Sequence, residues 1–192
     1  MKVNLQNLKS LMRIVLYSAA LFFIISDDNH VFAQTTELNT LFRELEDPEN
    51  TDWESVELNI WHEWSKSGSA AMDHLLQRGI QAMQRGQLRV AVEHFSAVID
   101  HAPDFAEAWN KRATVFYMMD EYGLSISDIR QTLLLNPRHF GAMAGLGAIM
   151  EELDRPKNAL TIYRRALEVH PHQDGIKEAI ESLEIEVNGT SL

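Results

Sequence analysis

Apolar side chains recur at helical spacing along most of this chain. Near the C-terminus, glutamates face away from a stripe made of Ile176, Ile180, Leu183 and Val187. Near the N-terminus, a second stripe consists of Leu38, Leu41, Phe42 and Leu45. Pro48 ends the second stripe, and Thr51 or Asp52 can cap a further helix from Trp53 to about Lys66. No strand is evident, so the pattern predicts an all-α chain.

The middle of the chain repeats itself. Pro103, Pro137 and Pro171 are evenly spaced along the sequence, and a fixed period of this size is typical of stacked helical repeats. Small residues should meet where two antiparallel helices cross closely, and the pairs at equivalent positions are Gly79 with Ala91, Ala113 with Ser125, and Gly147 with Ala159. Four residues after each pair comes a large side chain that should fill the space beside the crossing, namely Phe95, Ile129 or Tyr163.

The first residues have a different character. The basic residues Lys2, Lys9 and Arg13 precede an apolar run over 14–25, and the small residues of a cleavage site follow at Val31 and Ala33. This order predicts a signal peptide over residues 1–33, removed before Gln34. The apolar run is shorter than the roughly 20 residues that a membrane-spanning helix needs, which disfavours a stable anchor. We therefore expect an exported bacterial protein, with the periplasm as its location.

Composition narrows the class of partner. The chain has 192 residues, a formal net charge of −11 and no cysteine. Nucleic-acid binding depends on clustered Lys and Arg, so this charge argues against such a partner. The missing cysteines exclude disulfides and a lipid anchor on cysteine. The expected partner is another protein or a peptide segment, of apolar or basic character.

The repeats resemble the tetratricopeptide repeat family, which is built from helix-turn-helix units of about 34 residues. The units are 72–105, 106–139 and 140–173, and the second matches the family pattern at Trp109, Ala113, Phe116, Ser125, Ile129 and Pro137. Arg78 and Arg112 depart from the usual Leu, and Ala82 departs from the usual Tyr. The resemblance implies a right-handed α-solenoid of three tetratricopeptide helix hairpins over residues 72–173.

The ends of such a stack need covering, because a stack exposes an apolar face wherever it stops. Residues 174–187 are predicted to form a capping helix, with 188–192 as a tail. Residues 34–69 are predicted to form a degenerate N-terminal helical hairpin that seals the front of the stack. Trp61 and Trp64 support this position, because a repeat one period earlier would place its large second-helix residues there.

Candidate reactive groups all have a structural interpretation. The stretch His101 to Ala113, "HAPDFAEAWNKRA", is predicted to be a seam in which Pro103 starts the junction between units. The Ser and His residues around Ser69 and His74 lack the Gly-x-Ser-x-Gly turn of a hydrolase. His170 and His172 lack paired helical spacing for a metal. No catalytic residue, metal or cofactor is expected.

In the tetratricopeptide family the first helix of each unit lines a concave groove. This resemblance nominates as peptide-binding residues Asp73, Leu76, Ile80, Asn110, Thr114, Tyr117, Ala144 and Ala148. The amide of Asn110 can bond both the N–H and the C=O of a ligand backbone. Some family members hold a C-terminal carboxylate with Lys and Asn. Apolar residues or Gly141 and Gly145 occupy the corresponding positions here, which disfavours that mode.

The predicted function is a noncatalytic protein–protein interaction module, acting as an exported adaptor or assembly factor. Two alternatives belong to other classes. One is an accessory chaperone for envelope proteins, which would suppress aggregation of unrelated unfolded clients. The other is an enzyme that uses the tryptophan-rich N-terminal hairpin, whose turnover would depend on Ser69 or His74.

Overall fold

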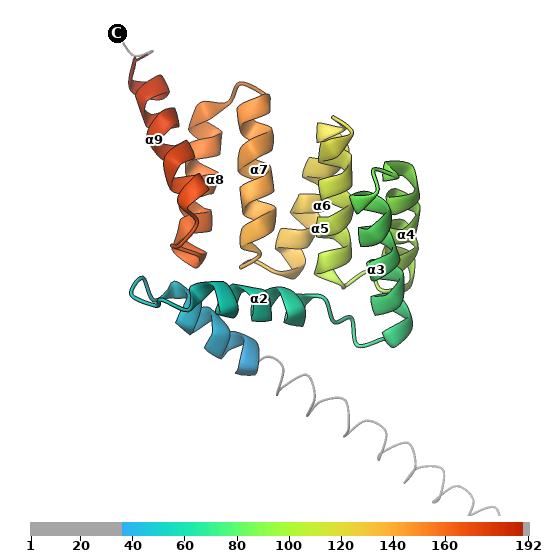
Figure 1. The fold of residues 1–192 in the computed structure, drawn as a ribbon. Helices are drawn as coiled ribbons and strands as arrows, with labels where there is room; N and C mark the ends of the chain where they lie inside the picture. The colour runs from blue at the N-terminus through green and yellow to red at the C-terminus, as the bar shows by residue number, and fades with distance from the viewer. Residues whose placement is uncertain (1–35, 190–192) are drawn as a thin grey trace, which may run out of the picture. The chain divides into compact units, whose positions relative to one another are not determined.

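The computed structural model describes residues 36–189, all of whose regular elements are helices (Figure 1). Internal contacts divide the chain into residues 1–40 and residues 41–192. The described part of the first unit, residues 36–40, is helical; the features below belong to the second unit. The predicted signal peptide and the last three residues of the predicted tail lie outside the described residues. Within residues 36–189, no helix is long and apolar enough to span a bilayer.

The helix pairs follow the predicted units. They are α3 (Ala70–Gln84) with α4 (Leu88–His101), α5 (Ala106–Met118) with α6 (Tyr122–Leu135), and α7 (Phe140–Glu152) with α8 (Pro156–Val169). The final helix, α9 (Asp174–Gly189), packs against α8 as the predicted cap. The all-α array of paired helices is confirmed (Figure 1).

Each helix crossing brings a small residue against a large one. A Cβ added at Gly79 would lie 2.4 Å from the Phe95 ring, and one at Gly147 would lie 2.2 Å from the Tyr163 ring. Neither crossing has room for a methyl group. In the middle pair the Ser125 hydroxyl donates to the Ala113 carbonyl at 2.8 Å. The predicted register of small and large positions is therefore confirmed.

The turn inside each helix pair contains a residue with a left-handed backbone. These residues are Gly86 (φ 71°), Asp120 (φ 60°) and Asp154 (φ 54°), which occupy the same position in successive units. The next N–H in each case donates back to a helix carbonyl at 2.9 Å, in the bonds Gln87 to Ala82, Glu121 to Phe116 and Arg155 to Met150. This is the glycine-type helix ending that satisfies carbonyls otherwise left unpaired.

The stretch His101 to Ala113 is a seam, as predicted. Helix α4 ends at His101 and α5 begins at Ala106. The indole N–H of Trp109 donates to the Pro103 carbonyl at 2.9 Å, which ties the turn to the following helix.

The prediction that the N-terminal hairpin seals the front of the stack is wrong. Residues 41–46 are helical, and α2 (Trp53–Trp64) follows them; together they form the N-terminal hairpin (residues 41–64). Its aromatic rings pack on turns that follow the second and third helix pairs, at residues 138–140 and 170–172. We call these two turns the turn edge. Figure 1 shows α2 lying across these helix ends.

Two features explain this different position. The tryptophans of α2 pack on the flat side chains of His139, Phe140 and His172. The hairpin also connects to α3 through residues 65–69, where Gly68 adopts φ 82°. The left-handed backbone at Gly68 redirects the chain, so α2 does not continue the stacking of α3.

Candidate functional site

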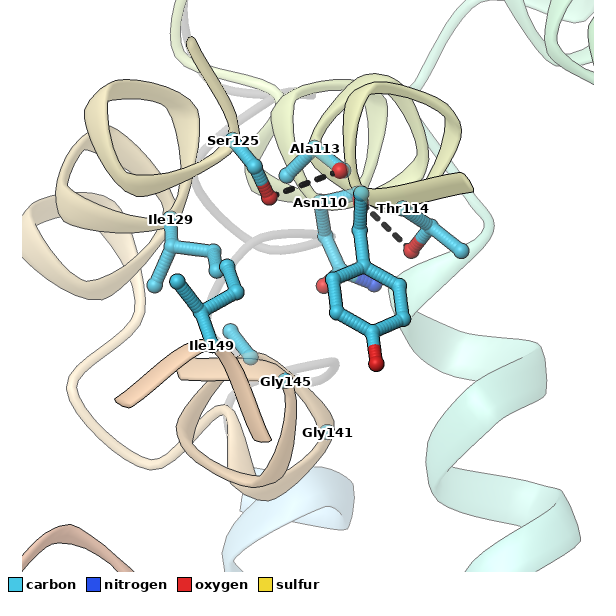
Figure 2. A pocket seen from close by; sticks show the side chains of 10 residues that line it. Asn110, Ala113, Thr114, Ser125, Ile129, Gly141, Gly145 and Ile149 are labelled. Atoms are coloured by element: carbon cyan, nitrogen blue, oxygen red, sulfur yellow. Dashed lines mark hydrogen bonds between the residues drawn. The ribbon is translucent and has the colours of Figure 1, made fainter. Parts of the chain in front are cut away.

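A cavity of about 80 Å³ lies between the second and third helix pairs (Figure 2). Its walls come from α5, α6 and α7 and consist of Asn110, Ala113, Thr114, Tyr117, Ser125, Ile129, Gly141, Ala142, Gly145 and Ile149. Gly145 contributes no side chain to the α7 wall, where a Cβ would lie 3.9 Å from Ile129, and this leaves the space open. We call this cavity and its opening the groove.

The structure brings only part of the predicted peptide-binding set together. Asn110, Thr114 and Tyr117 line the groove from successive turns of α5. Ala144 and Ala148 are half-buried on α7 but do not line it. Gly145 and Ile149 line it instead, each one residue after a predicted position of this helix.

The candidates on α3 have other surroundings. Leu76 is fully buried in a core cluster with Phe95 and Val98, so its prediction as a groove residue is wrong. Ile80 is half-buried and packs against the same cluster. The Asp73 carboxylate accepts from the Ser67 N–H at 2.7 Å and from the Ser67 hydroxyl at 2.6 Å. Asp73 therefore closes the loop before α3.

A buried carboxylate lies directly behind Asn110. Glu107 is 1% exposed, and its Oε2 accepts from the Asn110 Nδ2 at 3.1 Å. The same oxygen accepts from the His139 Nε2 at 3.0 Å. His139 accepts the Ala142 N–H on Nδ1 at 3.1 Å, so its proton resides on Nε2. The other oxygen of Glu107 pairs with the Lys111 Nζ at 2.8 Å.

These partners determine the charge state of Glu107. Burial alone would raise the pKa of its carboxyl group, because a low-dielectric surrounding disfavours charge. The hydrogen bond from His139 and the charge of Lys111 outweigh that effect and lower the pKa below its ordinary value. Glu107 is therefore an anion at neutral pH, and it orients the amide of Asn110.

Sequence reasoning missed Glu107 and His139 as a pair, although one signal was available. Position 139 is equivalent to Phe105 in the first unit, where the side chain is buried. A histidine in place of a core phenylalanine needs a polar partner. That partner comes from the start of the same unit, 32 residues earlier in the chain.

The N-terminal hairpin packs on both partners of Glu107. The Trp64 ring stacks on the His139 ring with centroids 4.2 Å apart and planes 18° apart. The Lys111 Nζ lies 5.0 Å from the centroid of the Trp61 ring. Trp61 also approaches the groove wall, because a Cβ at Gly141 would lie 2.6 Å from its ring.

A second set of contacts holds the other end of α2. The Trp53 ring stacks on the His172 ring with planes 2° apart, and it meets the His170 ring edge-on. The Glu57 carboxylate accepts from the Trp61 indole at 3.0 Å and lies 3.4 Å from the His170 Nε2. The interaction with His170 lowers the pKa of the Glu57 carboxyl group.

Two tyrosines and three acids form a cluster with Tyr117, whose side chain lines the groove. Tyr117 lies beside Tyr122, with ring centroids 5.8 Å apart, and the hydroxyl of Tyr163 donates to the Glu151 carboxylate. We call this set the tyrosine rim, comprising Tyr117, Tyr122, Tyr163, Asp120, Glu151 and Glu152. Desolvation, followed by the charges of Glu152 and Asp120, raises the pKa of Tyr122. Desolvation and the bond to Glu151 raise the pKa of Tyr163, so both of these hydroxyls are protonated at neutral pH.

The tryptophan-rich hairpin does not assemble a reaction centre around Ser69 and His74. Ser69 precedes α3 as its N-cap residue, and His74 is exposed on that helix. The His172 Nε2 donates to the Asp47 carbonyl at 3.0 Å. Between residues 36 and 189, no three His, Asp or Glu side chains gather in a way that could hold a metal ion.

Comparison with known proteins agrees with this architecture. A family model described as tetratricopeptide repeat matches residues 76–126. A TPR repeat-containing protein of Rhizobium etli is 32% identical over 163 residues, which covers 83% of this chain and 79% of that protein. DnaJ homolog subfamily C member 3 of Rattus norvegicus is 26% identical over 129 residues, but this covers only 26% of its length.

Solved structures share the helix array. The Sgt2 TPR domain from Aspergillus fumigatus has a TM-score of 0.60 at 18% identity, covering 64% of this chain and 83% of that domain. The first TPR of Spaghetti (RPAP3), bound to the HSP90 peptide SRMEEVD, has a TM-score of 0.59 at 19% identity, covering 61% of this chain and 93% of that one. Given the extent of the Rhizobium etli match and the three regularly repeated helix pairs, the chain belongs to the TPR repeat-containing protein family.

Proposed function

We propose that this chain is a noncatalytic adaptor that holds a short extended segment of another protein in the groove between α5 and α7. The observation that carries the proposal is the position of Asn110. Its side chain lines the groove, and Glu107 fixes its amide from behind. A fixed amide can bond the backbone of an extended ligand whatever the ligand sequence.

The rim favours a basic or apolar segment. Asp120 and Glu152 interact with Tyr122, and Glu151 accepts from the Tyr163 hydroxyl. Both of these tyrosines interact with Tyr117, which lines the groove. Aromatic faces with nearby carboxylates attract Lys and Arg side chains. The HSP90 peptide bound by the Spaghetti domain is acidic at its end, Glu-Glu-Val-Asp. Such a peptide would meet like charge here, so we propose a ligand of the opposite charge.

A titration tests the groove directly. We expect a synthetic peptide of alternating lysine and leucine to bind the protein, and a peptide of alternating glutamate and leucine to bind more weakly. Asn110→Ala and Tyr117→Ala should each weaken binding by about 1–3 kcal/mol, because few anchors carry most of such an interface. The control is Arg130→Ala on α6, where the side chain is exposed.

Calorimetry measures these affinities, after circular dichroism has established that each variant is folded. Equal affinity of the parent and both groove variants, combined with loss of binding in Arg130→Ala, would place the interface on α6. A preference for the glutamate peptide would overturn the proposed charge of the ligand.

We also propose that the adaptor acts after export, in the periplasm. The support is the basic, apolar and small-residue order of residues 1–33. Sequencing the N-terminus of the protein purified from the producing cells should give Gln34 as its first residue. Retention of Met1 would contradict the export proposal.

A further inference from the structure

We infer that the N-terminal hairpin controls the groove through a buried relay. The relay runs from the two tryptophans of α2 to Glu107, and from Glu107 to Asn110. While the hairpin is docked, the Asn110 amide is held in one orientation. When the hairpin leaves the turn edge, this orientation is lost and the groove binds its ligand less tightly. The inference rests on the proposed function only for its effect on ligand affinity.

The first step connects the hairpin to both sides of one carboxylate. Trp64 covers the His139 ring, which donates to Oε2 of Glu107. Trp61 covers the Lys111 ammonium, which pairs with Oε1 of Glu107. Both partners of Glu107 therefore depend on the hairpin for part of their surroundings.

The second step connects that carboxylate to the groove. Asn110 donates to the same Oε2 atom that accepts from His139. A carboxylate that loses one strong donor turns toward its remaining partners, because a buried charge requires hydrogen bonds. A rotation of Glu107 therefore moves the acceptor of the Asn110 amide. Glu107 and His139 are positioning residues in this scheme, since neither lines the cavity.

The third step concerns the stability of the docked hairpin. Its interface buries the Trp64 indole N–H and the Nδ1 atom of His170 without hydrogen-bond partners. Water would satisfy these atoms in an undocked hairpin, and leaving a buried polar group unsatisfied opposes docking. The aromatic stacking that favours docking is thus partly offset. Because these opposing contributions are similar in kind and partly cancel, the hairpin can exchange between a docked and an undocked state, and a ligand can shift that equilibrium.

Thermodynamic linkage makes the coupling reciprocal. If docking raises ligand affinity by some factor, then the bound ligand stabilises the docked hairpin by the same factor. Networks of contacting side chains typically couple sites by about 0.5–2 kcal/mol, which corresponds to roughly 2- to 30-fold in affinity. We expect a factor in this range between the hairpin and the groove.

The experiment compares two substitutions on the same helix. Trp64→Ala removes the ring that covers His139, whereas Leu58→Ala changes a side chain of α2 that is 69% exposed. Two readouts need no ligand: the NMR signals of the Asn110 side-chain amide, and hydrogen exchange of the α2 backbone. The third readout is calorimetric affinity for the alternating lysine and leucine peptide.

We expect Trp64→Ala to shift the Asn110 amide signals, to speed exchange across α2 and to weaken peptide binding by roughly 2- to 30-fold. Leu58→Ala should match the parent in all three. In the parent, saturating peptide should slow exchange across α2. If Trp64→Ala leaves the hairpin protected, the double variant Trp53→Ala and Trp64→Ala replaces it, because it removes both stacked tryptophans.

An undocked hairpin with parent-like Asn110 signals would overturn the relay. Shifted Asn110 signals without any change in peptide affinity would overturn the control of binding. If the parent itself fails to bind the lysine and leucine peptide, the proposed ligand class is wrong. In that case the Asn110 amide signals of Trp64→Ala still show whether the relay exists. A wrong ligand class and a wrong relay therefore give different results.

Discussion

At the scale of the residue, Arg112 explains why the second unit departs from its family pattern. Its guanidinium forms two bonds to the Asp128 carboxylate, at 2.7 and 2.9 Å, and a third to the Ser96 hydroxyl at 3.0 Å. It also lies 5.0 Å from the centroid of the Trp109 ring. A bidentate pair of this geometry joins α5 to α6 and to the preceding α4. Leucine at this position would leave Asp128 buried and unpaired.

We therefore expect Arg112→Leu to lower the free energy of unfolding by about 3 kcal/mol, because it isolates a buried charge. The double variant Arg112→Leu and Asp128→Leu should recover much of the loss. Arg165→Ala is the control, since its pair with Glu168 is exposed and should contribute less than about 1 kcal/mol. Urea denaturation measures all three. A parent-like midpoint for Arg112→Leu would contradict this role of the ion pair.

Gly86 offers a second test at a single position. Its φ is 71°, and nothing lies within 4 Å of the place where a Cβ would be. Gly86→Ala should destabilise the protein by about 1–2 kcal/mol, purely through the left-handed backbone. Gly123 in α6 also has open space but a helical backbone, so Gly123→Ala should stabilise by about 0.5–1 kcal/mol. If thermal denaturation shows that both substitutions stabilise the protein, or that both destabilise it, the backbone explanation is wrong.

At the scale of the element, helix crossings match the size of two side chains. The first and third pairs combine glycine with an aromatic ring, at Gly79 with Phe95 and at Gly147 with Tyr163. The second pair has Ala113 and Ile129 at the equivalent positions. Where alanine replaces glycine on the first helix of a pair, isoleucine replaces the larger aromatic residue on the second helix. The repeat thus varies the two residues together.

We expect Gly79→Ala to destabilise the protein by about 1–3 kcal/mol, because the new methyl group would overlap the Phe95 ring. Adding Phe95→Ile copies the middle pair. The double variant should be more stable than the sum of the two single losses by about 0.5–3 kcal/mol, the range seen for residues in contact. Chemical denaturation of the four proteins gives this coupling. If the stability losses of the two single variants simply add in the double variant, the side chains at positions 79 and 95 do not compete for the same space.

The helix array could be predicted from sequence, because its small and large residues recur at a fixed period and each contact is local. The position of the hairpin could not. The apolar stripe of residues 38–45 and the tryptophans of α2 indicate that a helix face is buried, but they do not identify the surface that covers it. That surface comes from turns much later in the chain, and it includes His139, which stands where the first unit has the core residue Phe105. Leu76 was misplaced for a related reason, since the inward positions of a family do not report the local packing of its first helix.

At the scale of the whole molecule, two carboxylates with lowered pKa values, buried Glu107 and half-buried Glu57, make stability depend on pH. The pKa of Glu107 and that of Glu57 are lowered in the folded protein. A lowered pKa contributes stability that is complete above the ordinary value of 4.5 and is lost as pH falls through the folded value. The structure should therefore weaken below about pH 4.5 as these groups take up protons.

Glu107→Gln tests this dependence. The variant should be less stable than the parent at neutral pH, and the difference should shrink as pH falls below about 4.5, because only the parent has a carboxylate at position 107 that becomes protonated. Glu93→Gln on the exposed surface of α4 is the control and should follow the parent at every pH. The measurement is urea denaturation at several pH values. A constant difference between parent and Glu107→Gln would show that the carboxylate charge contributes nothing.

The hairpin joins the two ends of the described chain in a way that bears on how the protein is made. The bond from His172 to the Asp47 carbonyl spans 125 residues, whereas the contacts within each helix pair are local. During synthesis the hairpin leaves the ribosome first, yet the surface that it needs is complete only after residue 172 has emerged. Contacts of such long sequence separation form slowly. Trp53, which stacks on His172, therefore stays exposed to water until the third helix pair and the turn after it have folded. A late phase in refolding, visible as a change in tryptophan fluorescence, should report its docking.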